Sequence, residues 1–338
     1  MIISTDPLAD EDQDLQSDGQ EGSLPGIETE LRPWLVGDLQ HGLRLDQALV
    51  ELIPEFSRSY LQQLIATGSV VIHGVVQTRA SVRVKLGMQG VIELRPTPQS
   101  QAFRPEPMAL DSVFEDEHLR VINKPAGLVV HPAPGNWSGT LLNGLLAHDP
   151  MAATLPRAGI VHRLDKDTSG LMLVARSRQA MDALVRLIAA REVSRQYLAL
   201  AHRPWQGSRQ RDLEQAIGRD PRNRLRMAVV DLERQAGKTA KTSVELLENA
   251  VLGCWLKCTL HTGRTHQIRV HLAALGHPLV ADELYGGAPA AGMIRQALHA
   301  RRLAFVHPIT GQSMVMKADL PPDMKAALAA WGLRYNET

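Results

Sequence analysis

The sequence predicts an α+β protein with two domains behind an N-terminal tail. At 338 residues the chain is long for a single hydrophobic core, because domains commonly contain about 100–200 residues. Residues 96–108 are rich in Pro and polar side chains, a composition typical of a semi-rigid linker. On both sides of that linker, apolar residues at helical spacing alternate with short β-branched runs.

The first 35 residues are predicted to form an acidic, disordered tail. Residues 1–30 contain nine Asp or Glu, no Lys or Arg, and no apolar periodicity. The remaining chain has 27 acidic against 37 basic residues, a net charge of +10. A basic body favours a polyanionic partner such as nucleic acid, and a solvated charged surface explains the same charge equally well.

The sequence lacks the signals of membrane or secreted proteins. No run of about 18 apolar residues occurs, and the N-terminus lacks the basic-then-apolar order of a signal peptide. We therefore expect a cytoplasmic protein that makes no membrane contact.

Residues 36–95 are predicted to form a small domain of two helices and a β-hairpin. A first helix covers the apolar repeat that begins at Leu45. Ser57 can cap a second helix, and Gly68 is placed to end it. Val70–Ile72 then has the composition of a short strand that enters a turn.

Residues 109–338 are predicted to form the second domain. Residues 113–122 indicate a turn and a strand, and the apolar run Leu171–Ala175 suits a buried strand. Ser177 can cap a helix directly after that run. Several strands separated by single helices indicate an α+β sheet domain.

One carboxylate lies in a setting suited to a nucleophile. Asp165 lies between Arg163 and Lys166 and just before the small polar turn Thr168-Ser169-Gly170. Neighbouring positive charge keeps a carboxylate ionised near neutral pH, and an ionised carboxylate on a tight turn can attack an electrophilic ring or sugar carbon. A calcium loop beginning at Asp165 is excluded, because its twelfth position is Arg176 rather than a bidentate Glu.

No metal site is predicted. Thr265 can cap a helix that carries His266 and His271, but a spacing of five residues puts the two imidazoles on different helix faces. Cys254 and Cys258 would share one face of a strand, where free Cys is commonly a small core residue.

These residues resemble the signature motifs of the RluA-type pseudouridine synthases. The string from His162 to Gly170 matches the family pattern H-R-L-D-x-x-[ST]-[ST]-G. Arg195-Gln196-Tyr197-Leu198-Ala199 and Thr262-Gly263-Arg264-Thr265-His266-Gln267 resemble two further motifs of the family. His261 stands where the family usually has Glu. The resemblance extends from about Arg44 to the region of Pro321.

The resemblance implies a fold and a reaction. The fold is a mixed, largely antiparallel β-sheet with flanking helices, and the reaction converts uridine to pseudouridine without a cofactor. Asp165 would be the nucleophile or base, acting at the ring or at the sugar. Tyr197 would pack on the target base and take part in proton transfer, and Arg264 would be the ion-pair partner of Asp165. Taken alone, a Tyr on an apolar strand is more often a core residue.

Residues 36–95 resemble the S4 RNA-binding domain. The matching strings are Arg44-Leu45-Asp46, Ser57-Arg58-Ser59 and Gly68-x-Val70-x-Ile72-x-Gly74. His73 and Met88 stand where Asn and Asp are usual. The resemblance implies RNA contacts by Arg44 and Arg58, with a generic small α+β domain as the alternative.

The resemblance also implies an RNA partner. Residues 130–136 and 157–162 are most similar to family members that modify large-subunit (23S) ribosomal RNA, in the helix 69 stem-loop that bridges to the small subunit. We expect His162, Arg163, Arg222 and Arg224 to contact this RNA, and a monomeric protein. The alternatives are the same reaction on transfer RNA or other ribosomal sites, and a non-catalytic RNA-binding factor in ribosome assembly.

Overall fold

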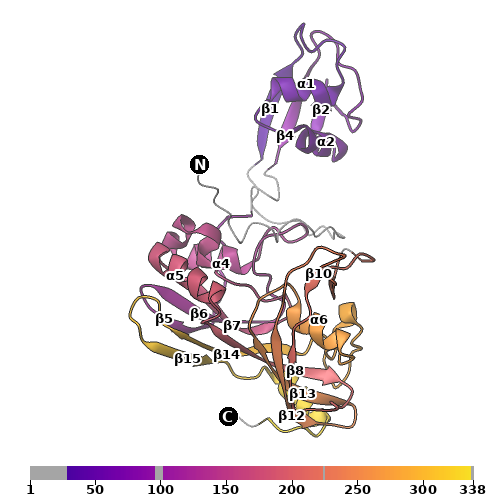
Figure 1. Cartoon of the computed structure of the whole chain (residues 1–338). Helices are drawn as coiled ribbons and strands as arrows, with labels where there is room; N and C mark the ends of the chain where they lie inside the picture. The colour runs from indigo at the N-terminus through magenta and orange to yellow at the C-terminus, as the bar shows by residue number, and fades with distance from the viewer. Residues whose placement is uncertain (1–28, 96–101, 224, 336–338) are drawn as a thin grey trace. The chain divides into compact units, whose positions relative to one another are not determined.

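The computed structural model describes residues 29–95, 102–223 and 225–335 and divides the chain into two compact units (Figure 1). The described residues up to Ala102 form the first unit, and those from Phe103 onward form the second. Each unit has a hydrophobic core of its own.

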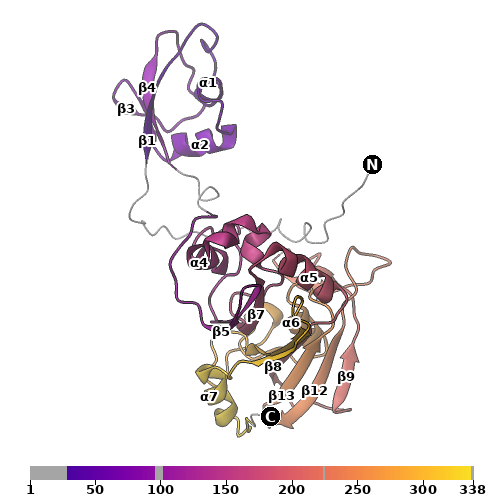
Figure 2. The same ribbon diagram turned by 90° about the vertical axis from the view of Figure 1, so that its left-hand side faces the viewer.

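The first unit is a four-stranded antiparallel sheet with two helices packed on one face (Figure 2). In sheet order its strands are β1 (Glu30–Leu35), β4 (Gln89–Leu94), β2 (Val70–Ile72) and β3 (Val75–Val76). Its helices are α1 (Leu45–Leu52) and α2 (Arg58–Ala66). As predicted, Ser57 caps α2, because its hydroxyl accepts a hydrogen bond from the Tyr60 N–H.

The predicted tail extends too far, because Glu30–Leu35 forms strand β1 and pairs with β4. Trp34 is buried in this strand, whereas Leu31 and Leu35 are 69% and 60% exposed. Acidic residues before the strand and Pro33 within it concealed it in the sequence. Pro is tolerated there because β1 is an edge strand. Residues 1–28 lie outside the described residues, so the tail itself stays a prediction.

The predicted linker also extends too far. Residues 96–101 lie outside the described residues, but residues 104–108 pack on helix α4 (Leu141–His148). The Asn143 side chain donates to the Arg104 carbonyl at 2.8 Å, and the Asn143 carbonyl accepts from the Glu106 N–H at 3.0 Å. These polar bonds, which the linker composition does not reveal, attach the segment to the second unit.

The second unit is built on a large, mostly antiparallel sheet, as predicted. Its strands, in sheet order, are β5 (Ser112–Glu115), β6 (Leu119–Lys124), β7 (Ser169–Ala175), β14 (Leu298–Val306), β8 (Ser194–His202), β13 (Gly253–Leu260), β12 (Thr242–Asn249) and β9 (Gln210–Leu213), with β15 (Ser313–Lys317) beside β14. The chain predicted as a turn and one strand forms the hairpin β5–β6. Strands β7 and β14 pair in parallel, with His299 beside Ser169. This pairing fixes the start of β7, just after Asp165.

Helices cover the sheet. Figure 2 shows α4 and α5 (Arg178–Ala189) side by side, with α7 (Pro322–Ala330) apart from them. The remaining helices are α6 (Gln267–Ala274) and the short 3-10 turns η1 (Pro150–Thr154), η2 (Pro156–Gly159) and η3 (Glu283–Tyr285). Ser177 caps α5 as predicted, accepting from the Ala180 N–H. In the part of the chain that the structure describes, every helix is too short or too polar to span a bilayer.

Strand β7 is buried on both faces, which explains its apolar sequence. Every residue from Ser169 to Ala175 is buried. Met172 and Val174 join one core cluster, while Leu171 and Leu173 join another. Because successive side chains of a strand point to opposite faces, β7 anchors the preceding turn from both sides.

A separate hairpin projects beside the main sheet. Residues 217–238, which we call the arginine-rich arm, contain β10 (Ile217–Arg219) and β11 (Met227–Val229). Figure 1 shows β10 close to α6. A small apolar cluster joins the base of the arm to the rest of the unit, and its members are Ile217, Met227, Ala240, Val270 and Tyr285.

Candidate active site

Asp165 lies on the turn before β7, and side chains from other segments hold the backbone of that turn. The Lys124 ammonium donates to the Lys166 carbonyl at 2.8 Å and to two further carbonyls. The Arg295 guanidinium donates to the Asp167 carbonyl at 2.9 Å. Burial lowers the pKa of Lys124 to about 8, and its three carbonyl partners replace lost water. The turn is therefore positioned through its carbonyls and leaves the Asp165 carboxylate free for other contacts.

Two basic side chains face the Asp165 carboxylate, one at each oxygen. Arg269 Nη1 lies 2.9 Å from Oδ2, and His266 Nε2 lies 3.9 Å from Oδ1. Asp282 fixes Arg269, because its two carboxylate oxygens accept from Nε and Nη2 at 2.8 and 2.9 Å. A bidentate pair of this kind sets the direction of the guanidinium as well as its position. The side chain of Asp165 remains 18% exposed.

The surroundings of Asp165 favour its ionised form. Burial on its own raises the pKa of Asp165. The positive charges of His266 in its protonated form, of Arg269 and of the neighbouring Arg163 outweigh burial and hold that pKa below its ordinary value. Burial lowers the pKa of His266, which disfavours the imidazolium form. At neutral pH an ionised carboxylate therefore faces a permanently charged guanidinium and a neutral imidazole.

A cavity of about 400 Å³ opens over this carboxylate. Asp165 and Tyr197 both line it, so the structure brings these two predicted site residues together. Tyr197 lies on β8 and is 5% exposed, and burial raises its pKa to about 12. Its hydroxyl therefore stays protonated at neutral pH, and the ring forms part of an apolar wall.

Arg264 is not the ion-pair partner of Asp165, and the predicted pairing is wrong. Its Nε donates to the Thr239 carbonyl at 3.1 Å, although the residue does line the cavity. Arg269, five residues later in the chain, takes the position at the carboxylate. A direct role of Arg264 toward a ligand in the cavity stays a prediction.

The start of α6 explains why Arg269, and not Arg264, contacts Asp165. The predicted cap at Thr265 is wrong, because α6 begins at Gln267 after His266 in a left-handed conformation (φ 55°, ψ 22°). The Gln267 side-chain oxygen accepts from the Arg264 N–H at 3.0 Å and from the Thr262 hydroxyl at 2.6 Å. With the loop held by Gln267, Arg269 falls on the face of α6 nearest Asp165.

Arg163 and His162 differ in what they offer to RNA. Arg163 is exposed at the cavity and carries a charge that can meet phosphate. His162 Nε2 accepts from the Leu173 N–H at 2.9 Å, and burial lowers its pKa to about 3. His162 is therefore a neutral ring that ties the turn to β7. It also lines the cavity, and its contact with RNA stays a prediction.

In the first unit, Arg44 and Arg58 converge on the buried Asp46. Arg44 Nε donates to Oδ1 at 2.9 Å, and Arg58 Nη2 donates to Oδ2 at 2.7 Å. Their side chains remain 41% and 48% exposed. Both arginines are thus held in place and still accessible, and their RNA contacts stay a prediction.

Of the two contacts predicted on the arginine-rich arm, the structure describes Arg222 alone, which lies outside the cavity lining. Arg222 is exposed, and its backbone N–H donates to Asp220 at 2.8 Å. Arg226 forms an ion pair with the same carboxylate at 2.6 Å. Arg224 lies outside the described residues. Asp220 therefore shapes the arm and leaves the Arg222 side chain directed to solvent.

Sequence reasoning missed Arg269, Asp282 and the contact of His266 with Asp165. A signal was present, because Arg269 stands between the apolar residues Ile268 and Val270, as a buried charged residue does. In the described ranges, no three His, Cys, Asp or Glu side chains are grouped so that they could hold a metal ion.

Comparison with known proteins finds the same kind of domain in a protein family and in a solved structure. The family described as RNA pseudouridylate synthase matches residues 118–274, which include Asp165, Tyr197 and Arg269. Among solved structures, human RNA pseudouridylate synthase domain containing 1 is 27% identical and superposes with a TM-score of 0.53, over 66% of this chain and 90% of that one.

Curated relatives match almost the whole chain. Ribosomal large subunit pseudouridine synthase D of Neisseria meningitidis serogroup B is 47% identical over 311 residues, which cover 88% of this chain and 81% of the relative. The enzyme of the same name from Escherichia coli K12 is 42% identical over 304 residues, covering 86% and 90%. With this identity and coverage, the chain belongs to the RluA family of RNA pseudouridine synthases.

Proposed function

We propose that this protein converts uridine to pseudouridine in large-subunit (23S) ribosomal RNA, with Asp165 as nucleophile or base. One observation carries the proposal: an ionised, partly exposed carboxylate lies in a cavity beside a buried Tyr. The RNA is inferred from relatives whose names specify the large ribosomal subunit. The helix 69 stem-loop is the proposed target, and the protein acts as a cytoplasmic monomer without a cofactor.

The reaction makes clear demands on the site. The bond from N1 of uracil to C1′ breaks, the ring turns, and a bond from C5 to C1′ forms, while C5 loses a proton and N1 gains one. A carboxylate can open this sequence at the sugar carbon or at the ring carbon. Arg269 keeps Asp165 ionised for either route, and Tyr197 supplies a flat apolar surface beside a turning base.

The cavity requires the target base to leave its stack. Its volume of about 400 Å³ lies in the range of small-molecule sites. Extrusion of a base costs a few kcal/mol and is easiest in loops, which favours a stem-loop over a continuous duplex. Arg163 at the cavity, Arg222 and Arg224 on the arm, and Arg44 and Arg58 of the S4-like unit supply phosphate contacts that are independent of sequence.

Tritium release provides the test. In large-subunit RNA labelled with tritium at uridine C5, each isomerisation expels the label into water. We expect release by the wild-type protein and its loss with Asp165→Asn, which keeps the shape of the side chain and removes its charge. Release that persists in the variant would reject Asp165 as the reacting group.

The substrate and the alternatives are tested in the same assay. Release from transfer RNA but not from ribosomal RNA would identify transfer RNA as the substrate. No release from free RNA or from assembled subunits would favour a non-catalytic RNA-binding factor. A binding factor has no use for an ionised carboxylate among arginines, because that charge repels phosphate.

A further inference from the structure

Tyr285 contacts both side chains that face Asp165, although it does not itself line the cavity. Its ring lies under the Arg269 guanidinium, with Cζ 5.0 Å from the ring centroid. Its hydroxyl lies 2.8 Å from His266 Nδ1, and the two rings meet edge to face at 83°. One residue therefore supports the groups at both oxygens of the carboxylate.

The hydrogen bonds assign a direction to this contact. The Tyr285 oxygen accepts from the Met227 N–H at 3.0 Å, so its own proton is available to His266 Nδ1. Burial raises the pKa of Tyr285 to about 12, so the hydroxyl keeps that proton. The neutral imidazole then carries its hydrogen on Nε2, directed at Asp165 Oδ1. The opposite tautomer would direct a lone pair at the carboxylate and be repelled.

The distance from His266 to Asp165 leaves room for a closer contact. At 3.9 Å, Nε2 is too far from Oδ1 for a hydrogen bond, which requires about 2.7–3.2 Å. Such contacts often tighten only when substrate binds. His266 also has a positive φ of 55°, a backbone conformation that costs roughly 1–2 kcal/mol outside Gly. The chain holds a strained residue at the point where it can approach Asp165.

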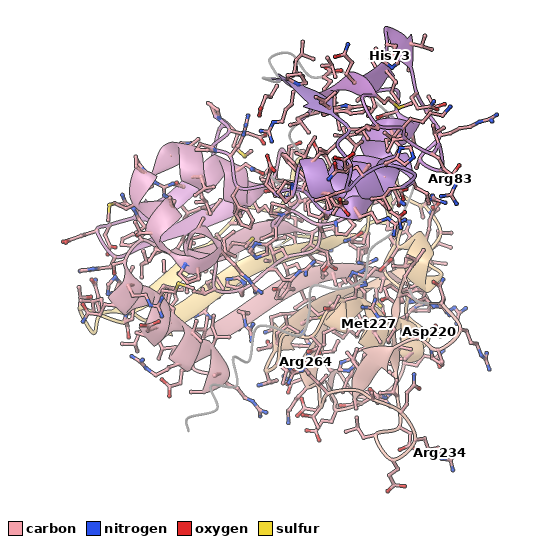
Figure 3. The ribbon with its side chains drawn as sticks, turned by 90° about the horizontal axis from the view of Figure 1, so that it is seen from above. His73, Arg83, Asp220, Met227, Arg234 and Arg264 are labelled. Carbon is pink, nitrogen blue, oxygen red and sulfur yellow. The ribbon has the colours of Figure 1, made fainter. Side chains whose placement is uncertain are left out.

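Met227 connects this arrangement to the arginine-rich arm. Met227 lies on β11 of the arm and packs with Tyr285, Ile217 and Val270 in a small cluster separate from the main core. Figure 3 shows Met227 and Asp220 on this arm, with Arg234 directed away from it into solvent. A shift of the arm therefore moves the N–H that orients the Tyr285 hydroxyl.

We propose that Tyr285 is a positioning residue that couples the arm to Asp165, so that seating of the arm on RNA brings His266 into hydrogen-bond distance of the carboxylate. The arm bound to RNA is then connected to the Asp165 carboxylate by a chain of contacts. The chain consists of the Met227 N–H, the Tyr285 hydroxyl and the His266 imidazole. This inference rests on the proposed function, because it assumes that RNA is the ligand of the arm.

Tyr285→Phe isolates the hydroxyl. The variant keeps the ring under Arg269 and removes the bonds to Met227 and His266, so we expect kcat for tritium release to fall about tenfold while KM for RNA stays within about twofold. Tyr335→Phe is the matched control, because Tyr335 also lies under an arginine, Arg301, at 5.8 Å. The control should keep wild-type kcat. An unchanged kcat in Tyr285→Phe overturns the proposal.

A double-mutant cycle tests the coupling. Arg222→Gln on the arm should raise KM and also lower kcat in the wild-type background. In the Tyr285→Phe background the same change should raise KM alone, because the connection to His266 is already broken. Independent, additive losses of kcat in the double variant would overturn the coupling.

A readout without turnover separates this proposal from the proposed function. The ¹⁵N chemical shifts of the His266 imidazole report its tautomer, and a His266→Gln variant identifies its signals. In the wild type we expect the imidazole hydrogen on Nε2, and in Tyr285→Phe we expect that preference to be lost. Adding the RNA stem-loop should change the His266 chemical shifts in the wild type. The change should be smaller in Arg222→Gln. If the His266 chemical shifts do not change when the protein is saturated with RNA, the coupling is contradicted. Absence of tritium release from the wild type contradicts the proposed function alone.

Discussion

Asp46 and Asp165 are both carboxylates held among basic side chains, and the difference between them separates a structural role from a reactive one. Asp46 is fully enclosed, and its oxygens accept from Arg44, Arg58 and Gln62 at 2.6–3.0 Å. Asp165 remains 18% exposed, with one short contact to Arg269 and one long contact to His266. A carboxylate that must react keeps an accessible oxygen with incomplete hydrogen bonding.

The two carboxylates also gain their charge differently. Burial disfavours ionisation of both. At Asp46 direct hydrogen bonds from Arg44, Arg58 and Gln62 hold the pKa well below its ordinary value of 3.8. At Asp165 the charges of the facing basic groups contribute more than its one hydrogen bond. Charge held at a distance leaves lone pairs available to a substrate.

The largest effect should follow removal of the reactive charge. Asp165→Asn should lower kcat at least about a thousandfold, as loss of a nucleophile does, with little change in Tm, because Arg269 keeps its pair with Asp282. Single-turnover tritium release and calorimetry on the same sample measure both quantities. A large fall in Tm would mean that Asp165 has a structural role like that of Asp46, and it would contradict the proposed difference between the two carboxylates.

Arg269→Gln should affect both stability and activity. It leaves Asp282, whose side chain is 1% exposed, without its charged partner, and breaking a buried pair in this way costs about 3–5 kcal/mol. It also raises the pKa of Asp165, so the acid limb of the pH–rate profile should move to higher pH. Urea unfolding and kcat at several pH values test the two effects. An unmoved acid limb would mean that another group sets the ionisation of Asp165.

Asp46→Asn should act on the first unit alone. Loss of charge-assisted hydrogen bonds should cost about 2 kcal/mol, seen as roughly thirtyfold faster amide exchange in α1 and α2 of the intact chain. Because the folded pKa of Asp46 lies below 3.8, its contribution is complete above about pH 5 and disappears as the pH falls through the folded pKa. The wild type should lose protection in acid, and the variant should lose less. Equal acid sensitivity in both would assign the effect to other carboxylates.

Local signals in the sequence predicted the local structure well. Ser57 and Ser177 cap helices where expected, and the run Leu171–Ala175 forms a buried strand. These predictions depend on neighbouring residues only. The same is true of the turn around Asp165, whose charge pattern lies within a few residues.

The remainder of the site depends on contacts that the sequence does not show. Arg269 and Asp282 are separated by a loop and pair only after folding. Arg264 and Arg269 stand in one short string, and the one that faces Asp165 is decided by the left-handed turn at His266. The strand β1 was missed for a related reason, because its pairing with β4 is distant in sequence.

The smallest effect concerns the arginines of the arm. Arg44 and Arg58 are fixed by Asp46, whereas the Arg222 side chain is exposed on the arm. Replacing Arg222 and Arg224 together by Gln should weaken RNA binding about tenfold and reduce the slope of log K against log salt by about 1.4, as expected for loss of two phosphate contacts to a single strand. Titrations at several salt concentrations measure that slope.

Arg178→Gln is the matched control, since Arg178 pairs with Asp182 on α5 and lies outside the cavity and the arm. An unchanged slope in the arm variant would place the phosphate contacts elsewhere and leave the held arginines of the first unit as the main grip on RNA.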